Sequence, residues 1–363
     1  MATQLLSVGT AVPNSRLPQS DVRDFFASQP GVDRRTARLI GAAFDQSAIA
    51  HRHTAIPLLD GEEGVFVDGD GRLHAPTTGE RNAVYRAEVP ALFAAAAEDA
   101  LARAGRSASE VTHVVTASCT GFFAPGPDFL LVRDLGIPAG AERYHIGFMG
   151  CAAAFPALRA AARFCEAQPG AVALVVCAEL CSLHIRSSPD PEQIVASAVF
   201  SDGAAAAVLA SDDRPRAGAS LEVGAFSTSI TSEGEDDMDW SIGDEGFEMR
   251  LTAEVPRIIG REIEAVAGPM LSGGAADAWA VHPGGRSVLD RVQAGLRLSD
   301  AAMAHSRAVL RDYGNMSSAT VLFILQRILA DDALGDRARV AGLCFGPGLT
   351  VETALFTRRE GAA

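Results

Sequence analysis

The stretch HIGFMGCAAAFPALRAAARFCEAQ, residues 145–168, determines how the rest of the chain is interpreted. An apolar run ends at Gly150, Cys151 follows, and an alanine-rich amphipathic pattern then predicts a buried helix. Unpaired N–H groups and the positive end of the helix dipole lie at a helix start, and they favour thiolate over thiol. Gly150 leaves room for a substrate to approach the sulfur. Pro156 removes one helix hydrogen bond and could kink the second turn of the helix. Cys151 is therefore a candidate nucleophile, although a cysteine alone could equally be a small core residue.

The composition indicates a globular protein with a large core. The chain has 363 residues, of which 48% are hydrophobic and 21% charged, which suits one duplicated unit or two domains. A net charge of −14 and a pI of about 5.0 argue against nucleic-acid binding and against a basic membrane-surface patch. We see no signal-peptide pattern and no apolar segment of ~18 residues, so we expect a cytoplasmic protein that does not span a membrane.

The cysteines and histidines give no metal-binding spacing. The six cysteines lie in apolar runs without C-x-x-C spacing, so we expect reduced thiols, no disulfide framework and no zinc site. His51, His53 and His74 fall in residues 51–86, which we expect to be an irregular surface region.

Buried strands alternate with helical patterns along the chain, which predicts a layered α/β fold. We expect strands at 3–9, 111–118, 143–147, 171–180, 203–210, 221–231, 278–281, 339–345 and 349–356. We expect helices at 19–28, 33–47, 91–105, up to about 135, 253–269, 284–296, 300–311 and 317–330. The acidic residues 233–239 read as a solvated loop. The polar stretch 211–220 predicts a boundary between an N-terminal half (1–215) with the candidate nucleophile and a C-terminal half (216–363).

The two halves resemble each other at one point. Gly150-Cys151-Ala152-Ala153 opens a buried helix late in the first half, and residues 314–318 open another apolar helix late in the second. We expect two copies of one unit, with two central helices side by side and their N-termini facing the same cavity.

Two further residues join Cys151 as candidates. His282 follows the strand at 278–281, at the carboxyl edge where α/β sheets place ligands, and we expect this strand to be central. Asn315 lies at a helix start, where it could also be only an N-cap. A histidine and an asparagine that both donate hydrogen bonds to one oxygen stabilise an enolate or a thioester oxyanion. No carboxylate is among the three, which suits decarboxylation of a malonyl thioester and attack of the carbanion on an acyl group held by Cys151.

These residues stand in motifs that resemble the type III polyketide synthases, the chalcone-synthase-like branch of the thiolase fold. The matching motifs are Gly147-Phe148-Met149-Gly150-Cys151, Val199-Phe200-Ser201-Asp202-Gly203-Ala204, Trp279-Ala280-Val281-His282-Pro283-Gly284-Gly285, Tyr313-Gly314-Asn315-Met316-Ser317-Ser318-Ala319 and Gly346-Pro347-Gly348-Leu349-Thr350-Val351-Glu352-Thr353. Ser201 departs from the family's glycine. The resemblance implies a duplicated, five-layer αβαβα thiolase fold, a homodimer, and no metal or bound organic cofactor.

The resemblance also implies roles for individual residues. Cys151 would hold the starter and the growing chain, His282 would keep it as thiolate, and His282 with Asn315 would drive malonyl-CoA decarboxylation. Phe200 and Met249 fall on the two gatekeeper positions between the CoA tunnel and the cavity. Further substrate-binding positions implied by the alignment are Cys119, Thr120, Ala124, His184, Gly346, Pro347 and Gly348. Ala124 falls where many relatives carry a methionine that reaches the partner's cavity, so we expect extra space there.

The CoA contacts depart from the family pattern. The basic residues of plant relatives fall near Leu39, Ala42 and Gln46 here. Nearby arginines, namely Arg34, Arg35, Arg38 and Arg52, are the candidates to replace them. The alternative is that an acyl carrier protein delivers the starter.

The expected reaction is extension of a Cys-bound acyl starter with malonyl-CoA, followed by cyclisation to an alkylresorcinol or alkylpyrone. A malonyl-primed, tetrahydroxynaphthalene-type synthase is the alternative product class, and Cys119 would suit it. Among other enzymes, a ketoacyl synthase III shares the Cys, His and Asn, and Cys344-Phe345-Gly346-Pro347-Gly348 fits the C-x-G-x-G pattern of thiolases. The non-enzymatic alternative is a pocket that only binds an acyl-CoA.

Overall fold

One continuous sheet of nine strands forms the frame of the molecule within the described residues. The computed structural model describes residues 2–59, 63–212, 214 and 218–361. The strands are, in spatial order, β11 (Ala278–Val281), β12 (Arg339–Gly346), β13 (Thr350–Arg359), β8 (Ser220–Ile230), β1 (Gln4–Ala11), β7 (Asp202–Ala210), β6 (Val172–Leu180), β4 (His113–Ser118) and β5 (Glu142–Gly147).

The sheet consists of two halves with the same pairing pattern. In the first, β1 is antiparallel to β7, β7 is antiparallel to β6, and β6 is parallel to β4. In the second, β8 is antiparallel to β13, β13 is antiparallel to β12, and β12 is parallel to β11. Only two residue pairs, Gln4–Glu222 and Leu5–Leu221, join β1 to β8. The halves can therefore diverge from this seam and leave space for helices between them.

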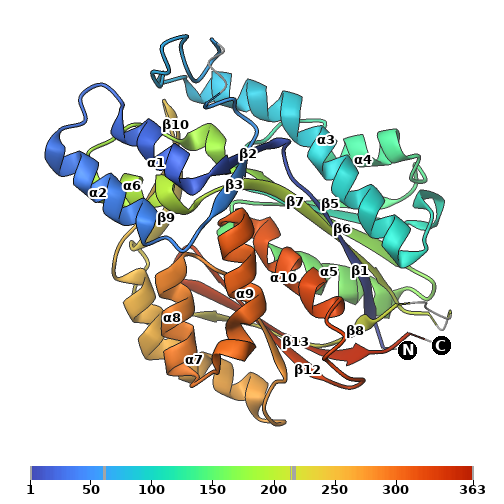
Figure 1. Cartoon of the computed structure of the whole chain (residues 1–363). Helices are drawn as coiled ribbons and strands as arrows, with labels where there is room; N and C mark the ends of the chain where they lie inside the picture. The colour runs from blue at the N-terminus through green and yellow to red at the C-terminus, as the bar shows by residue number, and fades with distance from the viewer. Residues whose placement is uncertain (1, 60–62, 213, 215–217, 362–363) are drawn as a thin grey trace.

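Two central helices, α5 (Ala154–Ala167) and α10 (Thr320–Leu329), fill that space (Figure 1). Their apolar side chains form one buried cluster with the inner faces of both halves of the sheet. Each helix is preceded by a 3₁₀ turn, Gly150–Ala152 before α5 and Ser317–Ala319 before α10, and the two turns are in contact. The predicted pair of helix starts at one place is confirmed.

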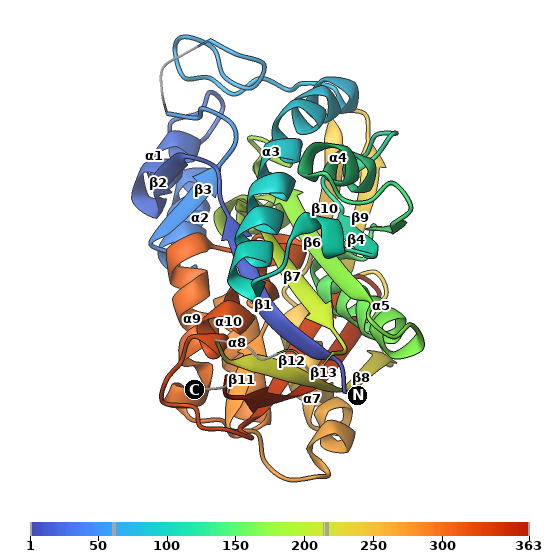
Figure 2. The same ribbon diagram turned by 90° about the vertical axis from the view of Figure 1, so that its right-hand side faces the viewer.

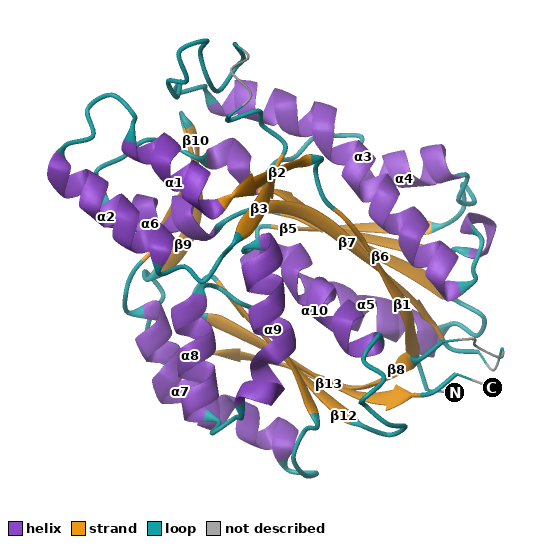
Figure 3. Ribbon diagram, viewed as in Figure 1, coloured by secondary structure: helices purple, strands orange, loops and turns teal. Residues whose placement is uncertain are grey.

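Outer helices cover the other two faces, which gives five layers. The long helix α3 (Thr78–Ala104) packs on β1, β6 and β7 in a second apolar cluster, and α4 (Pro127–Leu135) packs beside it. On the opposite side α7 (Val255–Leu271), α8 (Arg286–Gly295) and α9 (Asp300–Tyr313) form a third cluster with β11, β12 and β13. The order of layers remains visible after a quarter turn (Figure 2) and when helices and strands are coloured separately (Figure 3). The predicted αβαβα thiolase fold is confirmed.

Smaller elements surround one end of this frame. Helices α1 (Gln19–Ala27), α2 (Arg34–Asp45) and α6 (Pro191–Val199) pack against one another there. Two small antiparallel sheets accompany them: β2 (Ser15–Pro18) pairs with β3 (His51–Thr54) across α1 and α2, and β9 (Met238–Gly243) forms a hairpin with β10 (Gly246–Leu251).

Several sequence predictions are wrong in detail. Residues 51–86 are not all irregular, because β3 lies at His51–Thr54 and α3 begins at Thr78, where Thr77 and Glu80 form a capping box, and continues through Pro90. His53 is accordingly buried rather than on the surface. Pro156 lies in the first turn of α5, which begins at Ala154, and not in the second turn, so its missing N–H has no intrahelical partner to lose.

The predicted division of the chain at residue 215 falls on residues outside the described part of the structure, and it stays a prediction. The described helices include none that is long and apolar enough to cross a membrane. All six cysteines are free and buried.

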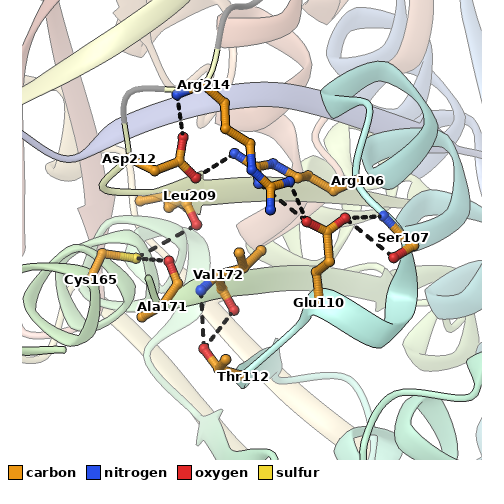
Figure 4. Close-up of polar contacts among 10 residues, drawn as sticks. All are labelled: Arg106, Ser107, Glu110, Thr112, Cys165, Ala171, Val172, Leu209, Asp212 and Arg214. Carbon is orange, nitrogen blue, oxygen red and sulfur yellow. Dashed lines mark hydrogen bonds and ion pairs between the residues drawn. The ribbon is translucent and has the colours of Figure 1, made fainter. Parts of the chain in front are cut away.

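An ion-pair network ties the end of α3 to the end of β7 (Figure 4). Arg106, just after α3, donates to Asp212 Oδ2 at 2.5 Å and to Glu110 Oε1 at 3.3 Å, and its side chain is only 4% exposed. Arg214 pairs with the same Glu110 from the surface at 2.5 Å. The Ser107 N–H and the Arg214 guanidinium lower the pKa of Glu110 to about 2.

Replacing Arg106 with alanine is expected to lower the free energy of unfolding by about 2 kcal/mol, because two half-buried carboxylates lose their shared cation. The matched variant Arg214→Ala removes an exposed partner and is expected to cost at most about 1 kcal/mol. Urea unfolding at pH 7 measures both. Equal losses in the two variants would contradict the assigned difference in burial.

Candidate active site

The turn that carries Cys151 is held close to a second loop. Gly150 has φ +58°, and a Cβ at this position would lie 2.6 Å from Cδ of Pro347. A Cβ on Gly346 would in turn lie 2.9 Å from the Met149 carbonyl oxygen. Glycine is therefore required on both sides, where the loop after β12 packs directly on the turn. This packing leaves Cys151 8% exposed at the wall of a cavity.

Asn315 faces Cys151 from the start of the other central helix. Its backbone is fixed by a bridge to Phe200, in which Ser201 N–H donates to the Asn315 carbonyl at 2.8 Å. Its side-chain Oδ1 accepts the Ser317 N–H at 2.9 Å. Since Oδ1 is committed to that donor, the amide Nδ2, 3.9 Å from Cys151 Sγ, presents its N–H groups to the thiol and the cavity.

His282 lies directly after β11 and lines the same cavity. Its main-chain N–H donates to the Leu343 carbonyl at 2.8 Å. Its imidazole is fully buried, and neither ring nitrogen has a hydrogen-bond partner among the described residues. Burial lowers the pKa of His282 to about 3, so the ring is neutral. A buried polar group without partners is rare in proteins, and this one is available to a bound molecule. The prediction that β11 is a central strand is wrong, because β11 is the edge strand of its half.

The environment of the thiol differs from the expectation of a thiolate held by the helix start. Burial raises the pKa of the Cys151 thiol to about 11, and hydrogen bonds from Ser317 and Asn315 counteract this only in part. The cysteine lies in the 3₁₀ turn before α5 rather than in the first turn of the α-helix. Ionisation of the thiol therefore needs a proton acceptor, and the free imidazole of His282 is a base lining the same cavity.

The cavity has a volume of about 930 Å³ and contains most of the residues predicted to bind substrate. Those that line it are Cys119, Thr120, His184, Phe200, Met249 and Pro347. Gly346 and Gly348 do not line it and instead shape the loop that packs on the nucleophile turn. Ala124 does not line it either, because its loop leaves the cavity and places Ala124 on the surface next to a cis peptide bond to Pro125.

The hairpin of β9 and β10 forms part of the cavity wall that the sequence did not predict. Trp240 of β9 and Phe247 of β10 line the cavity beside Met249, and Trp240 Nε1–H donates to the Cys119 carbonyl at 2.7 Å. Phe247 stacks on His184 at 4.3 Å, while its N–H donates to His184 Nδ1. His184 then donates from Nε2 to the Thr120 carbonyl, so both of its nitrogens are used and it shapes the wall as a neutral ring.

Glu179 is a buried carboxylate behind that wall, and sequence reasoning also missed it. It accepts hydrogen bonds from Thr120 Oγ1 at 2.9 Å, from the Cys119 N–H at 3.0 Å and from Ser318 Oγ at 2.5 Å. Burial raises the pKa of Glu179. A single acid within the apolar run 171–180 was the available signal. This carboxylate fixes Cys119 and Thr120 in the wall without lining the cavity itself.

The arginines expected to replace the family's CoA contacts do not lie in the cavity. Leu39 and Ala42 of α2 and its C-cap residue Gln46 line it, whereas the exposed Arg34, Arg35 and Arg38 do not. Arg52 is buried, and it donates to Gln19 Oε1 and to the carbonyls of residues 197, 198 and 200. Arg52 therefore supports the segment that carries Phe200 and is not available to a ligand.

Comparisons with known proteins agree with this fold and site. Family models for chalcone and stilbene synthases match the chain at residues 1–213 (N-terminal domain) and 223–358 (C-terminal domain). A 3,5-dihydroxyphenylacetyl-CoA synthase from Streptomyces toyocaensis is 33% identical over 362 residues, which cover 97% of this chain and 89% of that protein.

Two further matches come from Dictyostelium. The "Probable polyketide synthase 1" of Dictyostelium discoideum is 30% identical over 96% of this chain, which spans only 11% of that longer protein. The crystal structure of the C-terminal type III polyketide synthase domain of Steely1, a type I/III hybrid, superposes with a TM-score of 0.89 and 29% identity, covering 98% of this chain and 99% of that one.

The fold and these matches define an acyltransferase of the type III polyketide synthase class. The chain belongs to the chalcone and stilbene synthase family. Cys344, the second cysteine that a thiolase would need, is fully buried in β12 and does not line the cavity. The family assignment and this position favour the polyketide synthase over the thiolase and ketoacyl synthase III alternatives.

Proposed function

We propose that Cys151, His282 and Asn315 extend a Cys-bound acyl starter with malonyl-CoA and that the same cavity cyclises the product. The supporting observation is that a thiol, a partner-free imidazole and an amide N–H₂ group line one buried cavity of about 930 Å³.

Loading begins when His282 accepts the Cys151 proton. The sulfur attacks the carbonyl carbon of the starter thioester, the bond to the CoA sulfur breaks, and the imidazolium returns a proton to the departing CoA thiolate. The neutral imidazole that this leaves behind can then donate a hydrogen bond in the extension step.

Extension begins when the malonyl carboxylate leaves as CO₂. The electron pair of the broken C–C bond forms an enolate, whose oxygen accepts hydrogen bonds from His282 and from Asn315 Nδ2. The enolate carbon then attacks the Cys151 thioester, and the sulfur leaves as thiolate with the chain lengthened by two carbons on CoA. A cationic donor would pair with the malonyl carboxylate and so oppose the loss of CO₂. Neither His282 nor Asn315 carries a formal charge, so neither has this effect.

An alkylresorcinol or alkylpyrone from a long acyl starter is the product we propose first. The cavity supports this because its lining includes the flexible side chains of Met238 and Met249 together with Leu251 and Ile259, which suit an alkyl chain. Met249 at the second gatekeeper position has a more flexible side chain than an aromatic residue, so the entrance can adapt to the acyl chain.

A malonyl-primed product is the second candidate. Cys119 places another thiol in the wall, 3.8 Å from Ser317 Oγ, and the Streptomyces relative is named for a dihydroxyphenylacetyl-CoA product. Mass spectrometry of products from labelled malonyl-CoA, alone and with acyl-CoAs from acetyl to palmitoyl, separates the candidates. A starter-containing resorcinol or pyrone supports the first and an aromatic product from malonyl-CoA alone the second. A product of one extension only would contradict both.

We also propose a homodimer in the cytoplasm. Strand β5 is the free edge of its half of the sheet, and Tyr144, Phe148 and Met149 are exposed on it and just after it. An exposed edge strand with exposed large apolar side chains on it and beside it is a surface that proteins usually cover. Analytical ultracentrifugation checks this, with twice the chain mass of 37.8 kDa expected.

A further inference from the structure

Three arginines line the cavity on the side formed by α7 and α8. We call Arg257 of α7 with Arg286 and Arg291 of α8 the α7–α8 arginine group. The side chains of Arg257 and Arg286 are 57% and 56% exposed, whereas Cys151 and His282 in the same cavity are buried. The arginine group therefore lies at the mouth, and the reactive groups lie at the inner end.

The arginines of this group form only weak ion pairs with the protein's own carboxylates. Arg257 pairs with Glu254 and Arg286 with Asp290 at 3.5 Å, and both pairs are solvent-exposed. Exposed pairs are weak and exchange readily for a better anion. Arg291 forms no ion pair within the described part of the chain, and its aliphatic stem lies against Gly260 of α7.

The sign of the charge at the mouth is opposite to that of the protein. The charged side chains that line the cavity are the three arginines, Glu192 and Asp290, which gives 3 − 2 = +1, on a chain of net charge −14. All 31 basic residues of the sequence are arginines. A guanidinium binds phosphate through two parallel hydrogen bonds, which an ammonium group cannot do.

The facing side of the mouth carries no charge of its own. Helix α2 and the two residues after it contribute Leu39, Ala42, Ala43, Gln46 and Ser47 to the lining. Its exposed Arg38 donates instead to the Arg34 carbonyl at 3.2 Å, outside the cavity. The only cations that line the described cavity are therefore those of α7 and α8.

We infer that the α7–α8 arginine group binds the phosphates of coenzyme A and directs the thioester arm inward to Cys151. This inference rests on the proposed use of CoA thioesters. The inference assigns the phosphate contacts to α7, which precedes β11 in the chain, and to α8, which follows His282. The sequence resemblance had placed these contacts on α2, across the mouth.

Calorimetric titration with coenzyme A and with phosphate-free pantetheine tests this on the intact protein. The variant Arg286→Ala/Arg291→Ala is expected to weaken coenzyme A binding by about ten- to hundredfold, with pantetheine binding unchanged. The single variant Arg291→Ala should fall between it and the wild type. In turnover, the KM for malonyl-CoA should rise by a similar factor while kcat changes by less than about twofold.

The matched control is Arg34→Ala/Arg38→Ala on α2, which removes the same charge near the same mouth. It is expected to leave both titrations at wild-type values. The inference is overturned if the α2 variant weakens coenzyme A binding instead, if the α8 variant leaves it intact, or if pantetheine binding falls equally. It is also overturned if the wild type binds coenzyme A no more tightly than pantetheine. Binding is read without turnover, so a protein that binds through these arginines but makes no polyketide would refute the proposed function alone.

Discussion

Replacing Cys151 with alanine is expected to reduce polyketide formation by at least about 10⁴-fold, because the acyl chain loses the thiol that faces Asn315 and shares the cavity with His282. Release of CO₂ from malonyl-CoA should persist, since His282 and Asn315 remain in place. Mass spectrometry of the intact protein after incubation with an acyl-CoA should show the acyl adduct on the wild type and none on the variant.

Two other cysteines provide controls for this variant. Cys165 lies on the same helix, α5, but its thiol contacts the carbonyls of Ala171 and Leu209 and does not line the cavity. Cys344 is the thiolase-like cysteine. Cys165→Ala and Cys344→Ala are both expected to keep most of the condensation activity. Loss of condensation in Cys344→Ala with activity retained in Cys151→Ala would reverse the roles proposed here.

Replacing His282 with glutamine is expected to lower kcat by about 10²- to 10⁴-fold, and it should also change the pH dependence of the thiol. Burial raises the pKa of Cys151 to about 11, and glutamine cannot accept its proton. Only the thiolate reacts with iodoacetamide, so a raised pKa means slower alkylation at low pH. In the variant the buried thiol has no imidazole to take its proton, so alkylation should be slow at pH 7 and rise about tenfold per pH unit up to the raised pKa.

In the wild type, proton transfer to His282 should make alkylation of Cys151 faster at pH 7 and shift its midpoint to lower pH. Peptide mass spectrometry follows Cys151 separately from the other thiols. His305→Gln is the control, because His305 pairs with Asp331 on the surface side of α9 and does not line the cavity. Superimposable pH profiles for the wild type and His282→Gln would show that the imidazole does not take the proton.

The sequence predicted the frame and the central site well because strong local patterns encode both. Strands β6 and β7 are buried at every position, and this yields the continuous apolar runs that identify them. Cys151, His282 and Asn315 each stand at the end of such a pattern, next to glycines. The topology brings those ends together, so predicting the fold correctly also predicted that the three side chains line one cavity.

The walls and the mouth of the cavity could not be predicted in the same way, because contacts distant in sequence determine them. Strands β9 and β10 alternate weakly and acquire their order from packing on His184. Arg52 resembles a surface cation in sequence, and only the fold shows that carbonyl groups surround it. In sequence, Glu179 only interrupts an apolar strand. Its role depends on hydrogen-bond donors from residues 118–120 and 318, which only the fold brings around it.

The central claim is that an uncharged carboxamide and imidazole at one cavity stabilise the enolate left when CO₂ departs. Release of labelled CO₂ from [3-¹⁴C]malonyl-CoA by Asn315→Ala tests it most directly, with Cys151→Ala as the reference that removes condensation only. We predict that Asn315→Ala releases CO₂ at least about 100-fold more slowly than the Cys151→Ala reference, because it loses one of two oxyanion donors. Release at the same rate in both variants would contradict the claim.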